Sequence, residues 1–240
     1  MQTVGFNRFV RKEWMDYTAF LASNSDNNVK QIKDKLNEYL KAEVKAEITR
    51  EKAVAQLTRM WVDVQKKNLS LKKEALALFE KVSQDEKMLI HWSMTILTFP
   101  IFVDVATSIG RIFNLQDHFS LKTLEKRIFE KWGERSTVKY ALQKIVGSMA
   151  DWGIIKRVKV GEYTRTEKIE IENIELKFFF LRCYLTALEK DYLKFIEANN
   201  LALAFPFHIN LRLEDFSISD TLTLNKVGSD VVIMGNIIKN

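Results

Sequence analysis

The chain has 240 residues, of which 47% are hydrophobic and only ten are Gly or Pro. This length allows one large domain or two ordinary ones, and the composition excludes a disordered chain. A single cysteine, Cys183, excludes an internal disulfide and a cysteine-rich zinc site, and it favours a reducing, cytoplasmic location. We therefore expect a mainly α protein with small β parts, an α+β fold.

The formal net charge is +6, but the excess is confined to one part of the chain. Residues 111–168 contain thirteen Lys or Arg against seven Asp or Glu, whereas the remaining residues balance at 24 of each. A basic excess on one module is typical of a phosphate-binding face. A Lys-rich face that only contacts water is the alternative interpretation.

Residues 1–98 are expected to form a helical N-terminal domain. Apolar spacing predicts a first helix over 6–22, a polar loop over 23–28 and a second helix over 29–40. Thr49 is the expected N-cap of a third helix, and Ser70 is expected to open a fourth.

The most apolar stretch, 88–113, is predicted to form two buried helices over 84–98 and 100–114. Ser83 and Glu86 match a capping box, and Pro100 fits the first turn of the second helix. Charged residues and Pro100 interrupt the stretch, and neither half reaches the roughly 20 apolar residues that a bilayer requires. We therefore expect no membrane partner.

Residues 99–172 have the pattern of a helix-turn-helix followed by a hairpin. Ser120 is a predicted N-cap, Gly133 is a predicted helix C-terminus, and Ser136 is the expected cap of the next helix. Two helices joined by a short turn with Gly are typical of this motif. Residues 154–160 and 163–171 are predicted to pair as a basic hairpin around Gly161.

The second helix, 137–152, separates an apolar side from an outward side that could bind DNA. Lys and Ser can contact phosphates, Gln can pair with adenine, and Gly147 is expected to permit close approach of another backbone. The predicted nucleic-acid-binding residues are Lys122, Lys126, Arg135, Ser136, Lys139, Tyr140, Gln143, Lys144, Lys156, Arg157, Lys159 and Arg165.

This order of cap, turn glycine, two-faced helix and basic hairpin resembles winged helix-turn-helix domains. The phrases IHWSMTILTFPIFVDVATSIGRIF and ERSTVKYALQKIVGSMADWGII, within residues 50–160, resemble the BrxA family, a small DNA-binding protein of BREX phage-defence systems. The resemblance implies double-stranded DNA binding without catalysis and other defence-system proteins as partners. Winged helices also dock proteins, so an interaction scaffold is the alternative function.

The segment 173–240 is expected to contain a long helix and a small antiparallel sheet. The helix is predicted over 175–199, with Cys183 as a core residue, and the strands over 207–213, 217–224 and 230–238. The three histidines are far apart in the sequence, and no glycine-rich phosphate loop or catalytic Ser motif is present. We therefore expect no enzyme activity, metal or cofactor.

Overall fold

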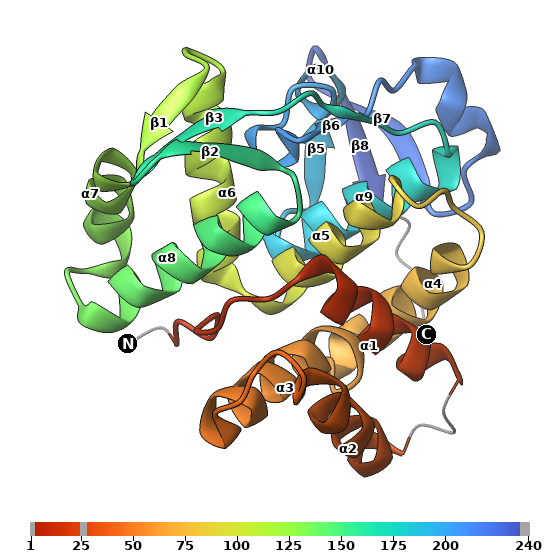
Figure 1. Cartoon of the computed structure of the whole chain (residues 1–240). Coiled ribbons are helices and arrows are strands. Elements are labelled where there is room, and N and C mark those ends of the chain that lie inside the picture. The colour runs from red at the N-terminus through yellow and green to blue at the C-terminus, as the bar shows by residue number, and fades with distance from the viewer. Residues whose placement is uncertain (1–2, 25–27, 236–240) are drawn as a thin grey trace.

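The computed structural model describes residues 3–24 and 28–235 and has the expected α+β class (Figure 1). Small sheets lie along one side of a larger body of helices, and α1–α4 form the layer at the opposite side. The N-terminal helices are α1 (Lys12–Asn24), α2 (Val29–Leu40), α3 (Glu47–Trp61) and α4 (Leu69–Phe79), with η1 (Lys66–Asn68) before α4.

The first predicted helix is wrong in its first half, because residues 3–11 form an extended arm and α1 begins at Lys12. The arm is held by Gln56, whose Oε1 accepts from the amides of Asn7 and Arg8 at 2.9 and 3.0 Å. Gln56 Nε2 donates back to the carbonyl of Arg8 at 3.0 Å. A buried side chain of α3 thus satisfies backbone groups that a helix would have paired internally.

Two predicted caps in this layer are also displaced. Helix α3 begins at Glu47 after Ala46, so Thr49 lies within the helix. Helix α4 begins at Leu69, one residue before Ser70. Part of the predicted polar loop, 25–27, lies outside the described residues.

The two predicted buried helices are present as α5 (Lys87–Thr98) and α6 (Pro100–Phe113), with Pro100 at the first position of α6. The bonds of the predicted capping box form. Ser83 Oγ accepts from the Glu86 amide at 3.3 Å, and Glu86 Oε2 accepts from the Ser83 amide at 3.3 Å. Glu86 Oε1 also accepts from the amides of Glu172 and Asn173. One buried carboxylate therefore joins the start of α5 to the start of helix α9 (Ile174–Ala187).

The buried apolar side chains form one continuous cluster that includes all three predicted segments, 1–98, 99–172 and 173–240. Trp92 of α5 lies in this cluster against the rings of Phe102, Phe205 and Phe207, and its indole N–H donates to the Leu203 carbonyl at 3.1 Å. Among the described helices, none is long and apolar enough to cross a membrane.

After α6 the elements run strand, helix, helix and hairpin. They are β1 (His118–Ser120), α7 (Leu121–Trp132), α8 (Ser136–Asp151), β2 (Ile155–Lys159) and β3 (Glu162–Arg165). The three strands form an antiparallel sheet in the order β1-β3-β2. The predicted second hairpin strand, 163–171, ends at Arg165, and β4 (Ile169–Glu170) instead pairs in parallel with β6 (Phe207–His208).

The C-terminal segment keeps the expected antiparallel sheet but changes its members. Helix α9 (Ile174–Ala187) ends well before residue 199, and β5 (Tyr192–Lys194) and α10 (Phe195–Ala198) follow. The sheet has the order β5-β8-β7, with β7 (Leu222–Val227) and β8 (Asp230–Gly235). Of the predicted strand over 207–213, only residues 207–208 form a strand, β6. The predicted strand over 217–224 begins only at Leu222, because residues 213–218 form the 3-10 helix η3. Residues 202–204 form the 3-10 helix η2, and 236–238 lie outside the described residues.

His91 of α5, which is fully buried, pairs with the partly exposed Asp16 of α1, and His91 Nε2 lies 2.8 Å from Asp16 Oδ1. Burial lowers the pKa of His91 and outweighs the raising effect of Asp16, and the charges of Lys12 and Lys87 lower it further. Burial raises the pKa of Asp16, but its hydrogen bond with His91 and the neighbouring positive charges bring that pKa below its usual value.

The protein is therefore expected to lose stability as the pH falls from about 6.5, where His91 of the unfolded chain takes up a proton that the folded chain resists. The variant His91→Gln keeps an N–H near Asp16 but does not titrate, so its loss should be smaller. Urea unfolding near pH 7.5 and near pH 5.5 measures both losses. Equal losses in the two proteins would contradict this assignment.

Candidate nucleic-acid interface

The turn between α7 and α8 is formed largely as the sequence indicates. Ser120 Oγ accepts from the Thr123 amide at 3.1 Å, which confirms the N-cap of α7. Gly133 ends α7 with a φ of 77°, a conformation that glycine adopts without strain. Ser136, however, is the first residue of α8 and not its cap, because Arg135 already occupies the cap position.

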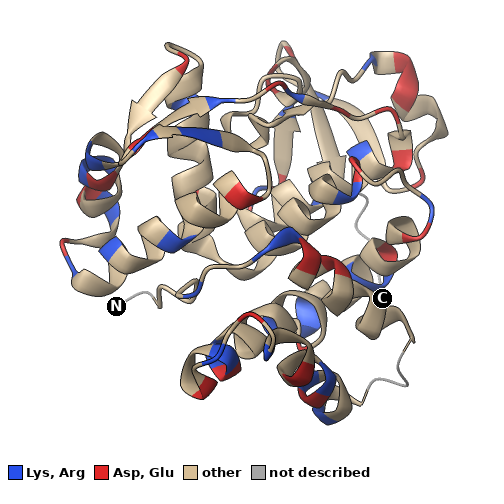
Figure 2. Cartoon of the chain, in the orientation of Figure 1, with Lys and Arg blue, Asp and Glu red and all other residues tan. Residues whose placement is uncertain are grey.

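Helix α8 has the predicted division into a buried and an outward side. Its buried side packs Val138, Leu142, Ile145 and Met149 into the core. Four of the predicted binding residues on α8 are exposed: Ser136, Lys139, Tyr140 and Gln143. Figure 2 shows Lys and Arg along α7, α8 and β2, with acidic residues among them on α7 and at the end of α8, and residues of both signs on α1–α4.

The N-terminal arm covers the C-terminal half of α8, which the sequence did not indicate (Figure 1). Ser148 Oγ accepts from the Val10 amide at 2.9 Å, and the Trp152 indole donates to the Val10 carbonyl at 2.9 Å. A Cβ placed on Gly147 would lie 3.5 Å from the Phe9 ring. Gly147 therefore packs beneath the arm, and the expectation that it admits another backbone is wrong.

Three of the predicted cations are already in ion pairs. Lys139 Nζ lies 3.4 Å from Glu125 Oε1 on α7, Lys159 Nζ lies 3.1 Å from Glu162, and Arg165 lies 2.9 Å from Asp117. All three cations remain about half exposed, so such pairs contribute little to stability and can be exchanged for a phosphate. Six predicted cations make no ion pair with the rest of the described chain: Lys122, Lys126, Arg135, Lys144, Lys156 and Arg157.

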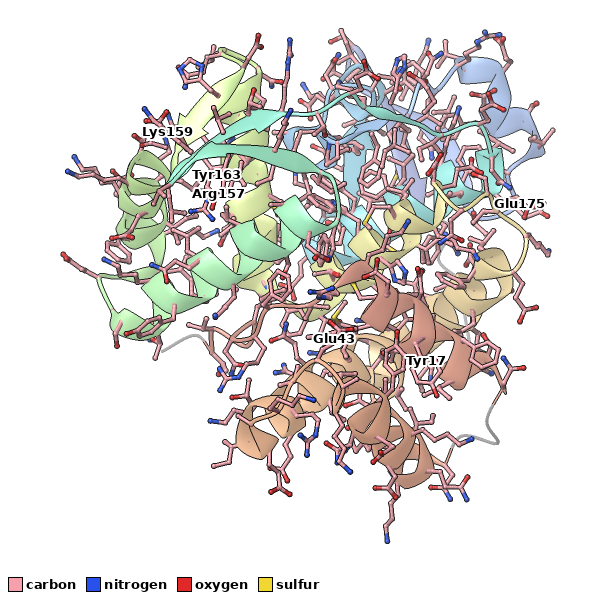
Figure 3. All side chains as sticks on the ribbon, in the orientation of Figure 1. Tyr17, Glu43, Arg157, Lys159, Tyr163 and Glu175 are labelled. Atoms are coloured by element: carbon pink, nitrogen blue, oxygen red, sulfur yellow. The ribbon has the colours of Figure 1, made fainter. Side chains whose placement is uncertain are left out.

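The hairpin cations divide between the two faces of their sheet. Arg157 lies opposite Tyr163 in the β2–β3 register, so it shares the face on which Tyr163 stacks against Phe119 (Figure 3). That face is turned towards the helices. Lys156 lies on the other face, opposite Thr164. Lys159 also lies on that face, because the register shift after Arg157 places it opposite Glu162. Arg165 lies opposite Ile155 and two residues from Tyr163, so Arg157 and Arg165 are the hairpin cations on the same side of the sheet as α8.

Arg135, Tyr140 and Lys144 lie apart from the rest of the predicted set. Together with Thr137 they line an open cleft of about 600 Å³ between the start of α8 and the arm. Arg8 of the arm lines the same cleft, which the sequence did not indicate because its apolar spacing predicts a helix over 6–22. A sequence signal that pointed away from a helix is Gly5, three residues before Arg8, and the structure gives this glycine a φ of 74°.

No group of three or more His, Cys, Asp or Glu side chains among residues 3–24 and 28–235 could hold a metal ion. His208 lies 2.8 Å from Glu170, His91 is paired with Asp16, and Cys183 is a free, buried thiol whose pKa burial raises well above its usual value. The thiol is therefore protonated at neutral pH and is a poor nucleophile.

Comparison with known proteins gives no match: no family model, no curated protein and no solved structure resembles the chain significantly. The class that the fold itself defines is α+β, with a mainly helical body and a C-terminal antiparallel sheet.

Proposed function

We propose that the protein is a non-enzymatic double-stranded DNA-binding protein and that residues 99–172 are a winged helix-turn-helix. The order α6-β1-α7-α8-β2-β3 with a three-stranded antiparallel sheet supports this proposal, since it is the order of helices and strands in winged-helix domains. The observation that carries it is a set of cations that make no ion pair with the rest of the described chain: Lys122 and Lys126 on α7 and Lys156 and Arg157 on β2 are exposed, and Lys144 on α8 is partly exposed.

In this proposal α8 enters the major groove with the side that the arm leaves open. Gln143 is exposed there and can bond the edge of an adenine, and Lys139 can exchange Glu125 for a phosphate. Lys122 and Lys126 on α7 are placed to contact the backbone, as the first helix of the motif does. Arg157, on the side of the hairpin sheet that is turned towards α8, adds a contact to a neighbouring phosphate of the same duplex.

The resemblance to the BrxA family supports the same kind of activity, DNA binding without catalysis. It also places the protein, as part of this proposal, in the cytoplasm beside other defence-system proteins. The buried free thiol of Cys183 is compatible with a reducing compartment.

Protein docking is the second candidate, because the hairpin tip is apolar. Val158 and Val160 are 64% and 85% exposed there. Of the N-terminal aromatics, Phe6 and Trp14 are buried in the core, whereas Phe20 is 56% exposed and is available for docking. A docking scaffold would require the two valines and would show no salt-dependent affinity for DNA.

Fluorescence anisotropy with a random duplex at low and at moderate salt tests the proposal. If four of the unpaired cations contact phosphates, the logarithm of the association constant should fall with the logarithm of salt concentration with a slope of about −4. Absence of binding at low salt, or binding that does not depend on salt, would contradict DNA binding and favour the docking function.

A further inference from the structure

The cleft between the arm and α8 is a built feature with fixed walls. Phe6 anchors the arm in the core, 5.2 Å from the Phe99 ring and 6.0 Å from the Phe102 ring. Gln56 of α3 then binds the arm backbone at Asn7 and Arg8, and Ser148 of α8 binds it at Val10. Since each anchor is buried, the arm is expected to stay in place when a ligand enters.

The cleft is lined by positively charged side chains, some of whose N–H groups have no hydrogen-bond partner in the described structure. Arg8, Arg135 and Lys144 line it, and no carboxylate does so among the described residues. Arg8 Nη1 donates to the Asn7 carbonyl at 2.7 Å, and Arg135 Nη2 donates to the Trp132 carbonyl at 3.1 Å. The Nε atom of each guanidinium is buried without a hydrogen-bond partner in the described structure. Both Nε atoms are shielded from solvent, so an anion in the cleft would instead be bound by the remaining N–H groups of the two guanidiniums and by the Lys144 ammonium, which are charged donors.

The other side of the cleft suits a flat ring. Tyr140 lines it and is 62% exposed, which is unusual for an aromatic side chain with no partner ring among the described residues. The Thr137 hydroxyl adds a donor and acceptor at the first turn of α8, where backbone amides favour negative charge. A cleft of about 600 Å³ lies in the size range of small-ligand sites.

We propose that this cleft binds a nucleoside phosphate, with the phosphate held by Arg8, Arg135 and Lys144 and the base stacked on Tyr140. The unit could come from a free nucleotide or from the 5′ end of a nucleic acid strand, since both present the same chemistry. The proposal does not depend on duplex binding, because Lys139, Gln143 and Arg157 do not line the cleft.

Isothermal titration of the full chain with AMP, inorganic phosphate and adenosine tests the site. AMP is expected to bind more tightly than phosphate, and adenosine to bind least, because the cations hold the phosphate and the ring adds stacking. Arg8→Gln should weaken the binding of AMP by about tenfold or more, because it removes a charge-assisted hydrogen bond to the phosphate. Tyr140→Ala should weaken the binding of AMP by about tenfold and leave the affinity for inorganic phosphate unchanged.

The matched control is Arg111→Gln, which removes an exposed arginine of α6 that does not line the cleft. It should bind AMP as the unchanged protein does. Failure of both AMP and phosphate to bind at millimolar concentration, or equal AMP affinity in Arg8→Gln and the unchanged protein, would overturn the proposal.

Oligonucleotides distinguish the two sources of the nucleotide. Tighter binding of a 5′-phosphorylated single strand than of AMP identifies a strand end, and tighter binding of AMP identifies a free nucleotide; either supports the site. The double variant Lys139→Glu with Arg157→Glu should keep its AMP affinity, whereas Arg8→Gln should keep its affinity for a duplex with 5′-hydroxyl ends. Loss of AMP binding in the double variant would overturn the proposed site without bearing on duplex binding.

Discussion

Reversal of two charges, Lys139→Glu with Arg157→Glu, is expected to weaken duplex binding by roughly a factor of 100 at low salt and to reduce the salt slope by about 2. The two residues come from α8 and from β2, and Arg157 lies on the face of the hairpin that is turned towards the helices. If both elements contact one duplex, each loses a phosphate contact and gains a repulsion. Anisotropy titrations across a range of salt concentrations measure both quantities.

The matched control is Lys33→Glu with Lys35→Glu on α2, which makes the same change in net charge on the opposite layer of the molecule (Figure 1). Both lysines are exposed, so neither double variant should alter the free energy of unfolding by more than about 0.5 kcal/mol. An equal loss of DNA affinity in the two variants would mean that only overall charge matters. Unchanged affinity in the first variant would show that the assigned face is wrong.

Replacement of Gly110 by alanine is expected to destabilise the protein by about 3 kcal/mol or more. A Cβ at this position of α6 would lie 1.9 Å from the carbonyl oxygen of Ala202 and 2.7 Å from its carbonyl carbon. The obstructing atoms belong to the backbone of η2, so a change of rotamer cannot relieve the overlap. Helix α6 would have to move away from η2, and chemical denaturation followed by circular dichroism measures the cost.

Gly147→Ala is the internal control, because it makes the same substitution within another helix. Its nearest neighbour would be the Phe9 ring at 3.5 Å, an ordinary van der Waals distance. Alanine is the better helix former by about 1 kcal/mol, so this variant should be as stable as the unchanged protein or more so. Similar destabilisation by both variants would show that the approach of α6 to η2 is not what requires Gly110.

The predicted binding residues fall on two surfaces, the open outward side of α8 and the cleft beside the N-terminal arm. This division could not have been predicted from the sequence. Helical periodicity places Lys139, Tyr140 and Lys144 on the outward side of one helix, and all three are at least partly exposed. Periodicity does not show what else packs against that side. The arm, more than 130 residues away in the chain, covers the half of α8 near Ser148 and makes a cleft with Arg8 at the other half.

The C-terminal errors have a similar cause. Apolar spacing predicted one helix through residue 199, but the chain turns at Glu189, with a φ of 52°, and β5 pairs with β8. Strand β5 has only three residues, which is too few to show the alternation of apolar and polar side chains that predicts a strand. The predicted strand over 207–213 fails because the Asn199 side chain bonds both the amide and the carbonyl of Leu211, at 2.7 and 2.9 Å, in place of a neighbouring strand.

The sequence by itself determined the elements whose signals are local: the buried pair α5 and α6 with Pro100 between them, the cap at Ser120, the turn at Gly133 and the basic character of residues 111–168. These depend on backbone stereochemistry and on side chains within one helical turn. The tertiary structure alone decided the course of the arm, the partners of β4 and β5, and which cations remain unpaired. Those outcomes depend on contacts between distant residues, because a buried donor takes whichever acceptor the fold brings near it.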